Sequence, residues 1–224
     1  MSAAARARQA LIDTALAMNA SGINQGMSGN LSLRCGEGFL ITPSGMEYTR
    51  CGPGDMVAMD LDGGWTGARK PSSEWRFHRD IYTARADAGA VLHAHSPWAA
   101  SLACTERGQR HGIPAFHYMV ALAGGRDIRC AAYHTFGTQA LSDAALAALD
   151  GRRACLLGNH GLLVLAADLP AALALAVEVE NLARGYCQAL MVGEPLLLDD
   201  AEMDRVLEKF KGYGAKAQRA PRDD

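Results

Sequence analysis

Three short apolar segments constrain the fold of this chain more than any other feature. Residues 90–93, 154–157 and 162–166 consist mainly of Ala, Val, Leu and Cys, and glycines lie close beside each of them. Segments of four or five apolar residues bounded by turns are typical of buried strands. The two longest apolar stretches are separated by Asp168, whereas a membrane-spanning helix needs about 20 apolar residues in a row. The sequence therefore predicts a buried sheet and no membrane segment.

Helical patterns accompany these strands. Earlier strands are expected at residues 30–34, 39–42 and 56–60, and a Gly-Glu-Gly turn joins the first two. Helices are expected before residue 21, from residue 72 to about 86, and over residues 98–104, 169–191 and 200–211. Strands first, then helices and strands mixed, predict a single α/β domain. We expect this domain to span residues 1–214 and the polar residues 215–224 to form a flexible tail.

Charge and cysteine content exclude several classes of protein. The 224 residues include 22 Lys and Arg against 24 Asp and Glu, a net charge of −2, whereas a nucleic-acid-binding surface needs a basic excess. The six cysteines stand at wide spacings without a Cys-x-x-Cys pair. We therefore expect reduced thiols, mostly in the core, in a cytoplasmic protein. An anionic ligand would have to be held by a local site.

Two histidines at strand spacing carry the main chemical signal. His93 and His95 end the apolar segment at 90–93, and residues two apart in a strand project to the same side. Two neutral imidazoles suit a cation such as zinc, and His160, in a Gly-rich turn between two apolar segments, is the best candidate for a third ligand. His-x-His alone is a weak signal, and two half-exposed histidines on a strand are the alternative.

A helix start and two polar turns suggest a place for phosphate. Pro71, Ser72, Ser73 and Glu74 predict a serine-capped helix, whose N-terminal N–H groups favour anions. The turns that contain Asn30 and the pair Ser44 and Gly45 are also rich in Gly, Ser and Asn and have no Lys. Together they would form a neutral cradle of backbone and hydroxyl groups. His78 follows Glu74 by one helical turn, which leaves it either at the same site, behind it, or on the helix surface.

With these residues the sequence resembles the class II aldolase/adducin family, and within it the bacterial L-fuculose-1-phosphate aldolases. The likeness covers nearly the whole chain. It runs through NQG at residues 24–26, SGNLS at 28–32, ITPSG at 41–45, PSSEWRFH at 71–78, HAH at 93–95, IPAFHYM at 113–119, TFGT at 135–138, HGL at 160–162 and LEKFKGYG at 207–214.

The resemblance implies a three-layer α/β/α domain around a mainly antiparallel sheet, assembled as a cyclic homotetramer with active sites at subunit interfaces. It implies a catalytic zinc ion and a phosphorylated ketose substrate. The residues it assigns are these: zinc ligands His93, His95, His160 and Glu74; phosphate-binding residues Asn30, Ser44, Gly45, Ser72 and Ser73; and two tyrosines, Tyr118 from a neighbouring subunit and Tyr213 near the C-terminus.

The expected reaction is reversible cleavage of L-fuculose 1-phosphate to dihydroxyacetone phosphate and L-lactaldehyde. Glu74 would act as the base at the reacting carbon and Tyr118 as the acid or base at the aldehyde oxygen. Three alternatives remain: an aldolase for 5-deoxyribulose or 5-methylthioribulose 1-phosphate, a sugar-phosphate epimerase, dehydratase or decarboxylase on the same scaffold, and a non-catalytic interaction module like the head of adducin.

Overall fold

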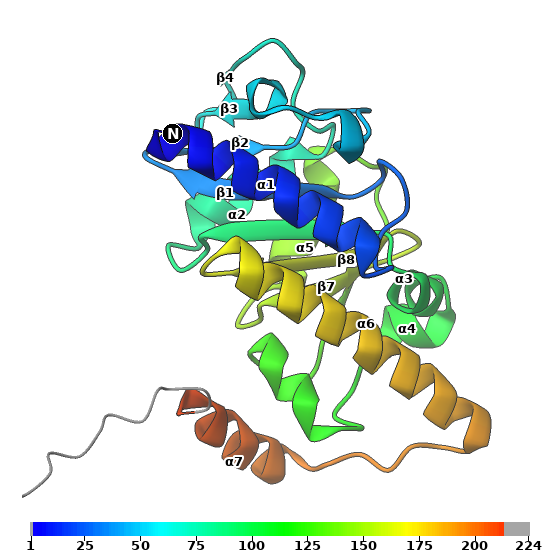
Figure 1. Cartoon of the computed structure of the whole chain (residues 1–224). Coiled ribbons are helices and arrows are strands. Elements are labelled where there is room, and N and C mark those ends of the chain that lie inside the picture. Colours follow the sequence, from blue (N-terminus) through cyan, green and yellow to red (C-terminus); the bar gives the residue numbers. More distant parts are fainter. Residues whose placement is uncertain (1, 213–224) are drawn as a thin grey trace, which may run out of the picture.

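The computed structural model describes residues 2–212, and its centre is one eight-stranded sheet. The strand order is β4-β3-β2-β1-β5-β8-β7-β6. Every neighbouring pair is antiparallel except β6 and β7 at one edge. The strands are β1 (Asn30–Cys35), β2 (Gly38–Ile41), β3 (Val57–Met59), β4 (Trp65–Thr66), β5 (Ala90–Ala94), β6 (Cys130–Ala131), β7 (Ala154–Leu157) and β8 (Gly161–Ala166). The predicted α/β domain with a mainly antiparallel sheet is confirmed (Figure 1).

Helices cover both faces of the sheet. They are α1 (Ala3–Ala20), α2 (Trp75–Ala84), α3 (Pro97–Ala103), α4 (Glu106–His111), α5 (Gln139–Ala148), α6 (Leu169–Val192) and α7 (Asp200–Lys211), with 3-10 turns η1 (Tyr48–Arg50), η2 (Pro53–Asp55) and η3 (Tyr118–Ala123). One core packs α1, α3 and α6 against the sheet, and a second packs α2 and α5 against the other face. The three layers follow from these two cores. Within residues 2–212, no helix is long and apolar enough to cross a membrane.

The alternation of side chains along β5 determines which helical layer His93 faces. Leu92 belongs to the core under α1 and α6, whereas Val91 belongs to the core under α2 and α5. His93 has the same parity as Val91, so its ring points toward the α2 side. Asn30 and Ser32 of β1 lie on that side too, because Leu31 between them belongs to the opposite core.

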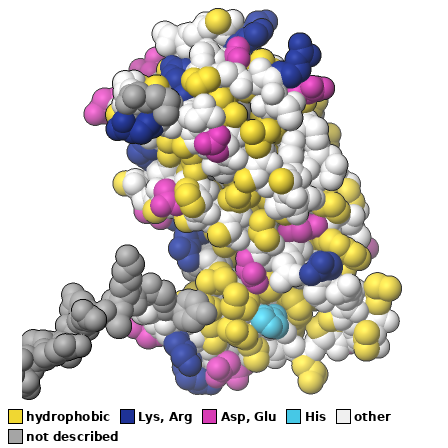
Figure 2. Space-filling model, viewed as in Figure 1, with side chains coloured by type: hydrophobic (Ala, Val, Ile, Leu, Met, Phe, Trp, Pro, Cys, Tyr) yellow, Lys and Arg dark blue, Asp and Glu magenta, His cyan; other side chains and the backbone are white. Residues whose placement is uncertain are grey.

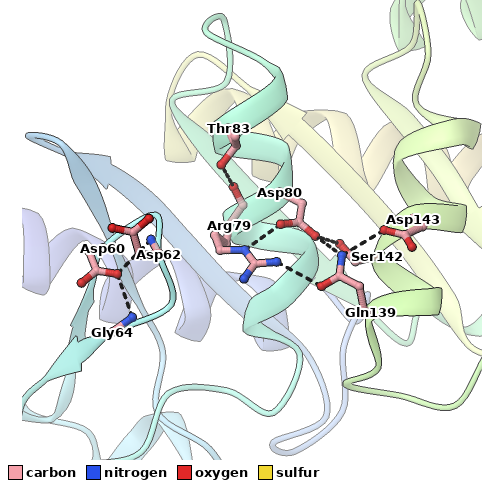
Figure 3. A network of polar contacts seen from close by, with 9 residues as sticks. All are labelled: Asp60, Asp62, Gly64, Arg79, Asp80, Thr83, Gln139, Ser142 and Asp143. Atoms are coloured by element: carbon pink, nitrogen blue, oxygen red, sulfur yellow. Dashed lines mark hydrogen bonds and ion pairs between the residues drawn. The ribbon is translucent and has the colours of Figure 1, made fainter.

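A polar cluster joins α2 to α5 at the edge of their apolar contact (Figure 3). The carboxylate of Asp80 accepts hydrogen bonds from Ser142 Oγ and Gln139 Nε2, each at 2.6 Å, and from Arg79 Nε at 2.6 Å. Burial alone would raise the pKa of Asp80, but the bonds from Arg79, Ser142 and Gln139 lower it below its ordinary value. The cluster therefore ties the two helices together while Asp80 is ionised.

The start of α2 differs from the prediction. The helix begins at Trp75 and ends at Ala84, and the predicted cap Ser72 accepts at Oγ from the N–H of Glu74 at 3.3 Å, one residue before the helix. Glu74 occupies the N-cap position without a side-chain capping bond. The reason is that the backbone N–H of Ser72 donates to Thr42 O at 3.0 Å, which keeps this segment extended beside a neighbouring loop.

The cysteine prediction is wrong in part. All six cysteines are free, but only Cys155 is buried, whereas Cys35 and Cys104 are exposed. The predicted tail at residues 215–224, the domain boundary at residue 214 and Tyr213 lie outside the described residues.

Candidate active site

Strand pairing brings the three predicted histidines together. His93 lies in β5 opposite Leu163 of β8, and His95 follows directly after β5. His160 occupies the turn between β7 and β8. The three ring centroids are 4.6 to 4.9 Å apart, and one nitrogen from each ring lies within 4.8 Å of the others. The three imidazoles therefore converge on one point at the end of the sheet.

The turn that carries His160 is held from outside. Asn159 has φ +52°, and no other non-glycine residue in the range 2–212 has a positive φ. Its N–H donates to Ala103 O at 3.0 Å, and its Oδ1 accepts from Gln109 Nε2 at 2.6 Å. A Cβ on Gly161 would lie 2.4 Å from Ala94 O, so only glycine allows this approach. The neighbouring helices α3 and α4 thus fix the position of His160.

Glu74 completes the cluster from the α2 side. Its side chain is buried, with Oε2 at 3.3 Å from His93 Nε2 and Oε1 at 3.3 Å from His160 Nε2. Asn30 Nδ2 donates to Oε2 at 2.9 Å. Asn30 pairs directly with His93 across β1 and β5, so the strand register determines which residue reaches the carboxylate.

Burial favours the neutral form of the three imidazoles, and a hydrogen bond determines which nitrogen of His93 carries the proton. Burial, together with nearby His95, lowers the pKa of His93 to about 3. Burial, with nearby His93, lowers the pKa of His160 to about 4, and burial also lowers the pKa of His95. His93 Nδ1 donates to Leu162 O at 2.8 Å. Because a neutral imidazole carries one proton, Nε2 of His93 is left with its lone pair free.

These donor atoms fit a divalent cation. Nε2 of His93, Nε2 of His95 and Oε1 of Glu74 are buried and have no hydrogen-bond partner among the described residues. A buried polar atom without a hydrogen-bond partner is costly. One cation bound among these three atoms would satisfy all of them. Three imidazoles and a carboxylate form a donor set typical of zinc.

The two polar turns and the segment before α2, which the sequence predicts to bind phosphate, also lie next to one another. The loop at Pro43 pairs with Pro71 in an antiparallel bridge, and Ser44 N–H donates to Lys70 O at 3.1 Å. Leu31 N–H, next to Asn30, donates to Thr42 Oγ1 at 3.2 Å. These contacts align the predicted phosphate residues, which the sequence alone could not place together. Of the predicted phosphate residues, Asn30 and Ser72 each contact Glu74: Asn30 Nδ2 donates to Glu74 Oε2, and Ser72 Oγ accepts from the Glu74 N–H at 3.3 Å.

Two adjoining cavities open over this region. One, of about 350 Å³, is lined by Ser73, Glu74, His95 and His160, among others. The second, of about 410 Å³, is lined by Ser44 and Gly45 with two arginines. Met27 lines both cavities, so the cavity at the histidines adjoins the cavity at the Ser-Gly loop.

Some lining residues had no chemical role in the sequence analysis. Tyr133, His134 and Phe136 line the histidine cavity, and Tyr133 and Phe136 are 57% and 65% exposed. Phe136 lies in a segment that resembles the family, but an exposed aromatic beside a polar site has no periodic signature. Gly137 brings this loop close, since a Cβ there would lie 2.7 Å from Ser73 O.

Tyr118 lies elsewhere in the chain. It begins η3, is half exposed, and stacks on the ring of Phe210 in α7 with centroids 6.4 Å apart. These two residues line a cavity of about 660 Å³ that shares no lining residue with the histidine cavity. Apolar side chains gather at this end of the molecule, beside α7 (Figure 2). A single chain therefore does not bring Tyr118 to the histidines.

Comparison with known proteins identifies the fold and its family. Residues 9–187 match the family described as class II aldolase and adducin N-terminal domain. The chain belongs to the class II aldolase and adducin family. The family resemblance found in the sequence is confirmed, and this class II aldolase is a lyase of the fuculose-phosphate and methylthioribulose-phosphate type.

Three relatives of this class II aldolase are informative. It is 55% identical over 211 residues to a 5-methylthioribulose-1-phosphate/5-deoxyribulose-1-phosphate aldolase of Rhodospirillum rubrum, covering 94% of each chain. It is 45% identical to an L-fuculose phosphate aldolase of Escherichia coli K12, covering 95% of this chain and 97% of the other. A solved structure of an L-fuculose 1-phosphate aldolase superposes with a TM-score of 0.87 at 40% identity, covering 94% of this chain and 98% of that one.

Proposed function

We propose that this class II aldolase cleaves 5-methylthioribulose 1-phosphate and 5-deoxyribulose 1-phosphate. The products are dihydroxyacetone phosphate and either methylthioacetaldehyde or acetaldehyde, because the bond between the third and fourth carbons breaks. One observation supports aldol chemistry above all: the unpartnered donor atoms of His93, His95 and Glu74 face one another beside polar, lysine-free loops. The 55% identical relative supports this choice of substrate over the one first expected from the sequence.

L-Fuculose 1-phosphate is the second candidate substrate. The relative of that name is 45% identical, and the superposed structure carries the same activity in its title. The candidates share the dihydroxyacetone phosphate half and differ in the aldehyde. A methyl or methylthiomethyl group needs apolar contacts, which Tyr133 and Phe136 offer at the mouth of the histidine cavity. Such packing discriminates substrates by only about 1–3 kcal/mol.

His93, His95 and His160 are proposed to hold one zinc ion, with Glu74 as a fourth ligand only in the resting enzyme. When bound, the cation supplies Lewis-acid polarisation of the ketone oxygen and compensates the charge that develops on it. Neutral imidazoles leave the cation its full charge, whereas thiolates would reduce it. The depressed pKa values of His93 and His160 support this role, because the rings need not lose protons before binding.

Glu74 is proposed as the base in the direction of synthesis. It takes a proton from the hydroxymethyl carbon of dihydroxyacetone phosphate and returns it during cleavage. The two oxygens of the carboxylate have different surroundings: Oε2 accepts from Asn30, whereas Oε1 has no hydrogen-bond partner among the described residues. One oxygen can therefore orient the group while the other exchanges the proton.

Phosphate binding is proposed for the polar loops, beside which Arg50 and Arg69 line the second cavity. Ser73 lines the histidine cavity, and Ser44 and Gly45 line the adjoining one. Asn30 and Ser72 each form a hydrogen bond with Glu74. Gly45 has φ +65° and no neighbour within 4 Å of its missing Cβ, so its backbone is open to a ligand. A phosphate anchored there holds the sugar in register with the base, which contributes to the rate through orientation.

Tyr118 is proposed to act in the site of a neighbouring subunit of a homotetramer. Its distance from the histidine cavity in one chain supports this assignment, as does the apolar surface around η3 and α7. In cleavage it would take the proton from the hydroxyl on the fourth carbon. Tyr213, which lies outside the described residues, is proposed to complete the same site.

A panel of three ketose 1-phosphates tests the proposal. Release of dihydroxyacetone phosphate is followed by a coupled reductase, with and without a chelator, for the 5-methylthio, 5-deoxy and fuculose compounds. We expect kcat/KM to be highest for the two 5-substituted ribuloses and activity to be lost with the chelator. A tenfold preference for L-fuculose 1-phosphate would favour the second candidate. Isomerised pentulose without dihydroxyacetone phosphate would contradict an aldolase.

A further inference from the structure

A continuous chain of buried side chains runs from the interior of the domain to Glu74. The hydroxyl of Tyr82 lies 2.8 Å from Ser32 Oγ, which lies 2.7 Å from His78 Nδ1. His78 Nε2 lies 2.6 Å from Asn30 Oδ1, and Asn30 Nδ2 donates to Glu74 Oε2 at 2.9 Å. Tyr82, Ser32 and His78 are 2%, 0% and 0% exposed. The proposed reaction uses none of these three residues.

The chain arises from two matched spacings. Glu74, His78 and Tyr82 stand four residues apart and form one stripe at the beginning and along the length of α2. Asn30 and Ser32 are alternate residues of β1 and face that stripe. A helical stripe packed on alternate strand positions thus gives an unbroken row of polar groups between α2 and the sheet, on the side of the second apolar core.

Glu74, the last residue of this hydrogen-bonded chain, determines the direction of every hydrogen bond in it. An ionised carboxylate only accepts, so the NH₂ group of Asn30 faces Glu74 and the amide oxygen faces His78. An amide oxygen also only accepts, which requires a proton on Nε2 of His78. Burial holds the pKa of His78 well below its ordinary value, so Nδ1 carries no proton and accepts from Ser32. Donors therefore point toward Glu74 throughout.

We propose that His78 is a positioning residue for the aldol reaction: by donating from Nε2 it fixes the orientation of the Asn30 amide, and Asn30 in turn holds Glu74 Oε2. This inference rests on the proposed role of Glu74 as the base. Without a donor at His78, only the Glu74 carboxylate orients the Asn30 amide, and the buried amide oxygen loses its partner. An amide that rotates away from this position turns its oxygen toward the carboxylate. Two acceptors face to face repel, so the carboxylate would leave its position near His93 and His160.

Kinetics of two substitutions test the proposal. We expect His78→Leu to lower kcat about 10- to 100-fold with KM changed less than about threefold, because the orientation of Glu74 is lost while the phosphate donors of Ser44, Gly45, Ser72 and Ser73 are kept. His78→Gln offers an amide N–H near the position of Nε2, and we expect it to restore kcat to within about threefold of the wild-type value. Ile81→Val, a buried apolar change on the same helix, controls for lost stability. It should leave kcat unchanged.

A double-mutant cycle tests whether His78 acts through Asn30. In an Asn30→Ala background, His78→Leu should lower kcat no further, because the residue it orients is absent. A further loss of the same size in that background would overturn the proposal. So would a rise in KM at constant kcat, which would assign His78 to phosphate binding, or equal kcat in His78→Leu and wild type.

A measurement without substrate separates this inference from the proposed function. In metal-free protein labelled with ¹⁵N-histidine, we expect His78 as the neutral Nε2–H tautomer, with a proton that exchanges slowly because the ring is fully buried. The Nδ1–H tautomer would overturn the inference even in an active enzyme. If the wild-type protein cleaves no ketose 1-phosphate, the proposed function fails, while this spectrum still reports the orientation of the Asn30 amide.

Discussion

Nδ2 of Asn30 lies 2.9 Å from Oε2 of Glu74, although 44 positions separate the two residues in the sequence. The contact joins the first residue of β1 to the N-cap of α2. It leaves Oε1 of the same carboxylate without a hydrogen bond among the described residues. One carboxylate thus has one oxygen held by Asn30 and one oxygen without a hydrogen-bond donor, as the proposed role of Glu74 as a base requires.

The role of Glu74 is tested by Glu74→Gln. The amide keeps the size of the side chain and an oxygen that accepts from Asn30, so metal content should stay near the wild-type value. Turnover should fall about 10²- to 10⁴-fold, the usual effect of losing a general base. Metal analysis and kcat with the preferred ketose 1-phosphate measure the two effects. Glu194→Gln, at an exposed carboxylate paired with Arg107, should retain full turnover; full turnover in Glu74→Gln would refute the assignment.

Metal binding should stabilise the fold. At a free zinc concentration of about 100 times Kd, linkage predicts about 2.7 kcal/mol, seen as a rise in Tm relative to chelator-treated protein. His95→Ala should remove most of this rise, because it deletes one of three converging nitrogens. His111→Ala, at an exposed position on α4, should preserve it. An equal zinc-dependent rise in His95→Ala would show that the cation binds elsewhere.

Acid should begin to destabilise the metal-free protein as the pH falls below 6.5, the ordinary pKa of histidine. Burial lowers the pKa of His93 to about 3, against an ordinary value of 6.5 in the unfolded chain. Below pH 6.5 the unfolded state therefore binds a proton that the folded state refuses, and stability falls as pH falls toward about 3. His160, with a pKa of about 4, acts in the same direction. Thermal unfolding of chelator-treated protein between pH 7 and pH 4 checks this, and a constant Tm would contradict it.

A site shared between subunits predicts complementation. Glu74→Gln and Tyr118→Phe proteins should each be nearly inactive alone. Co-expressed with different tags and purified as hybrids, they should regain activity in about a quarter of sites, since a random pairing joins an intact Glu74 to an intact Tyr118 that often. Oligomers in which both differently tagged chains carry the same variant are the control. No recovery in verified hybrids would place Tyr118 in the site of its own chain.

The Asp80 cluster should stabilise the domain only while Asp80 is ionised. The hydrogen bonds of Arg79, Ser142 and Gln139 outweigh the opposing effect of burial and lower the pKa of Asp80, so their contribution is present above the unfolded value of about 3.9 and lost as pH falls below it. Because the carboxylate is partly in contact with solvent, we expect Asp80→Asn to cost no more than about 1 kcal/mol near neutral pH. Urea unfolding of both proteins measures the difference, which should shrink toward pH 3.5. A difference independent of pH would contradict an ionic contribution.

Much of the secondary structure follows from local sequence. The short apolar runs that predict β7 and β8 are fully buried, and the last charged amphipathic segment forms α7 over the expected residues. Helix α5 is absent from the sequence prediction, although its buried Leu141 and Ala145 stand at helical spacing. Its position is fixed by packing against α2 and by the Asp80 cluster, and neither contact is visible in a local window.

For the site, the period of two along a strand is enough to direct His93 and His95 to one side, and the pattern of the PSSE segment is enough to draw attention to Glu74. The sequence alone does not say that Glu74 meets His160, that Asn30 donates to Glu74 rather than only to a ligand, or that His78 is buried behind it. Local periodicity determines which face of its own element a side chain occupies. The separation between elements depends on strand register and on how whole cores pack, and only the folded chain decides these.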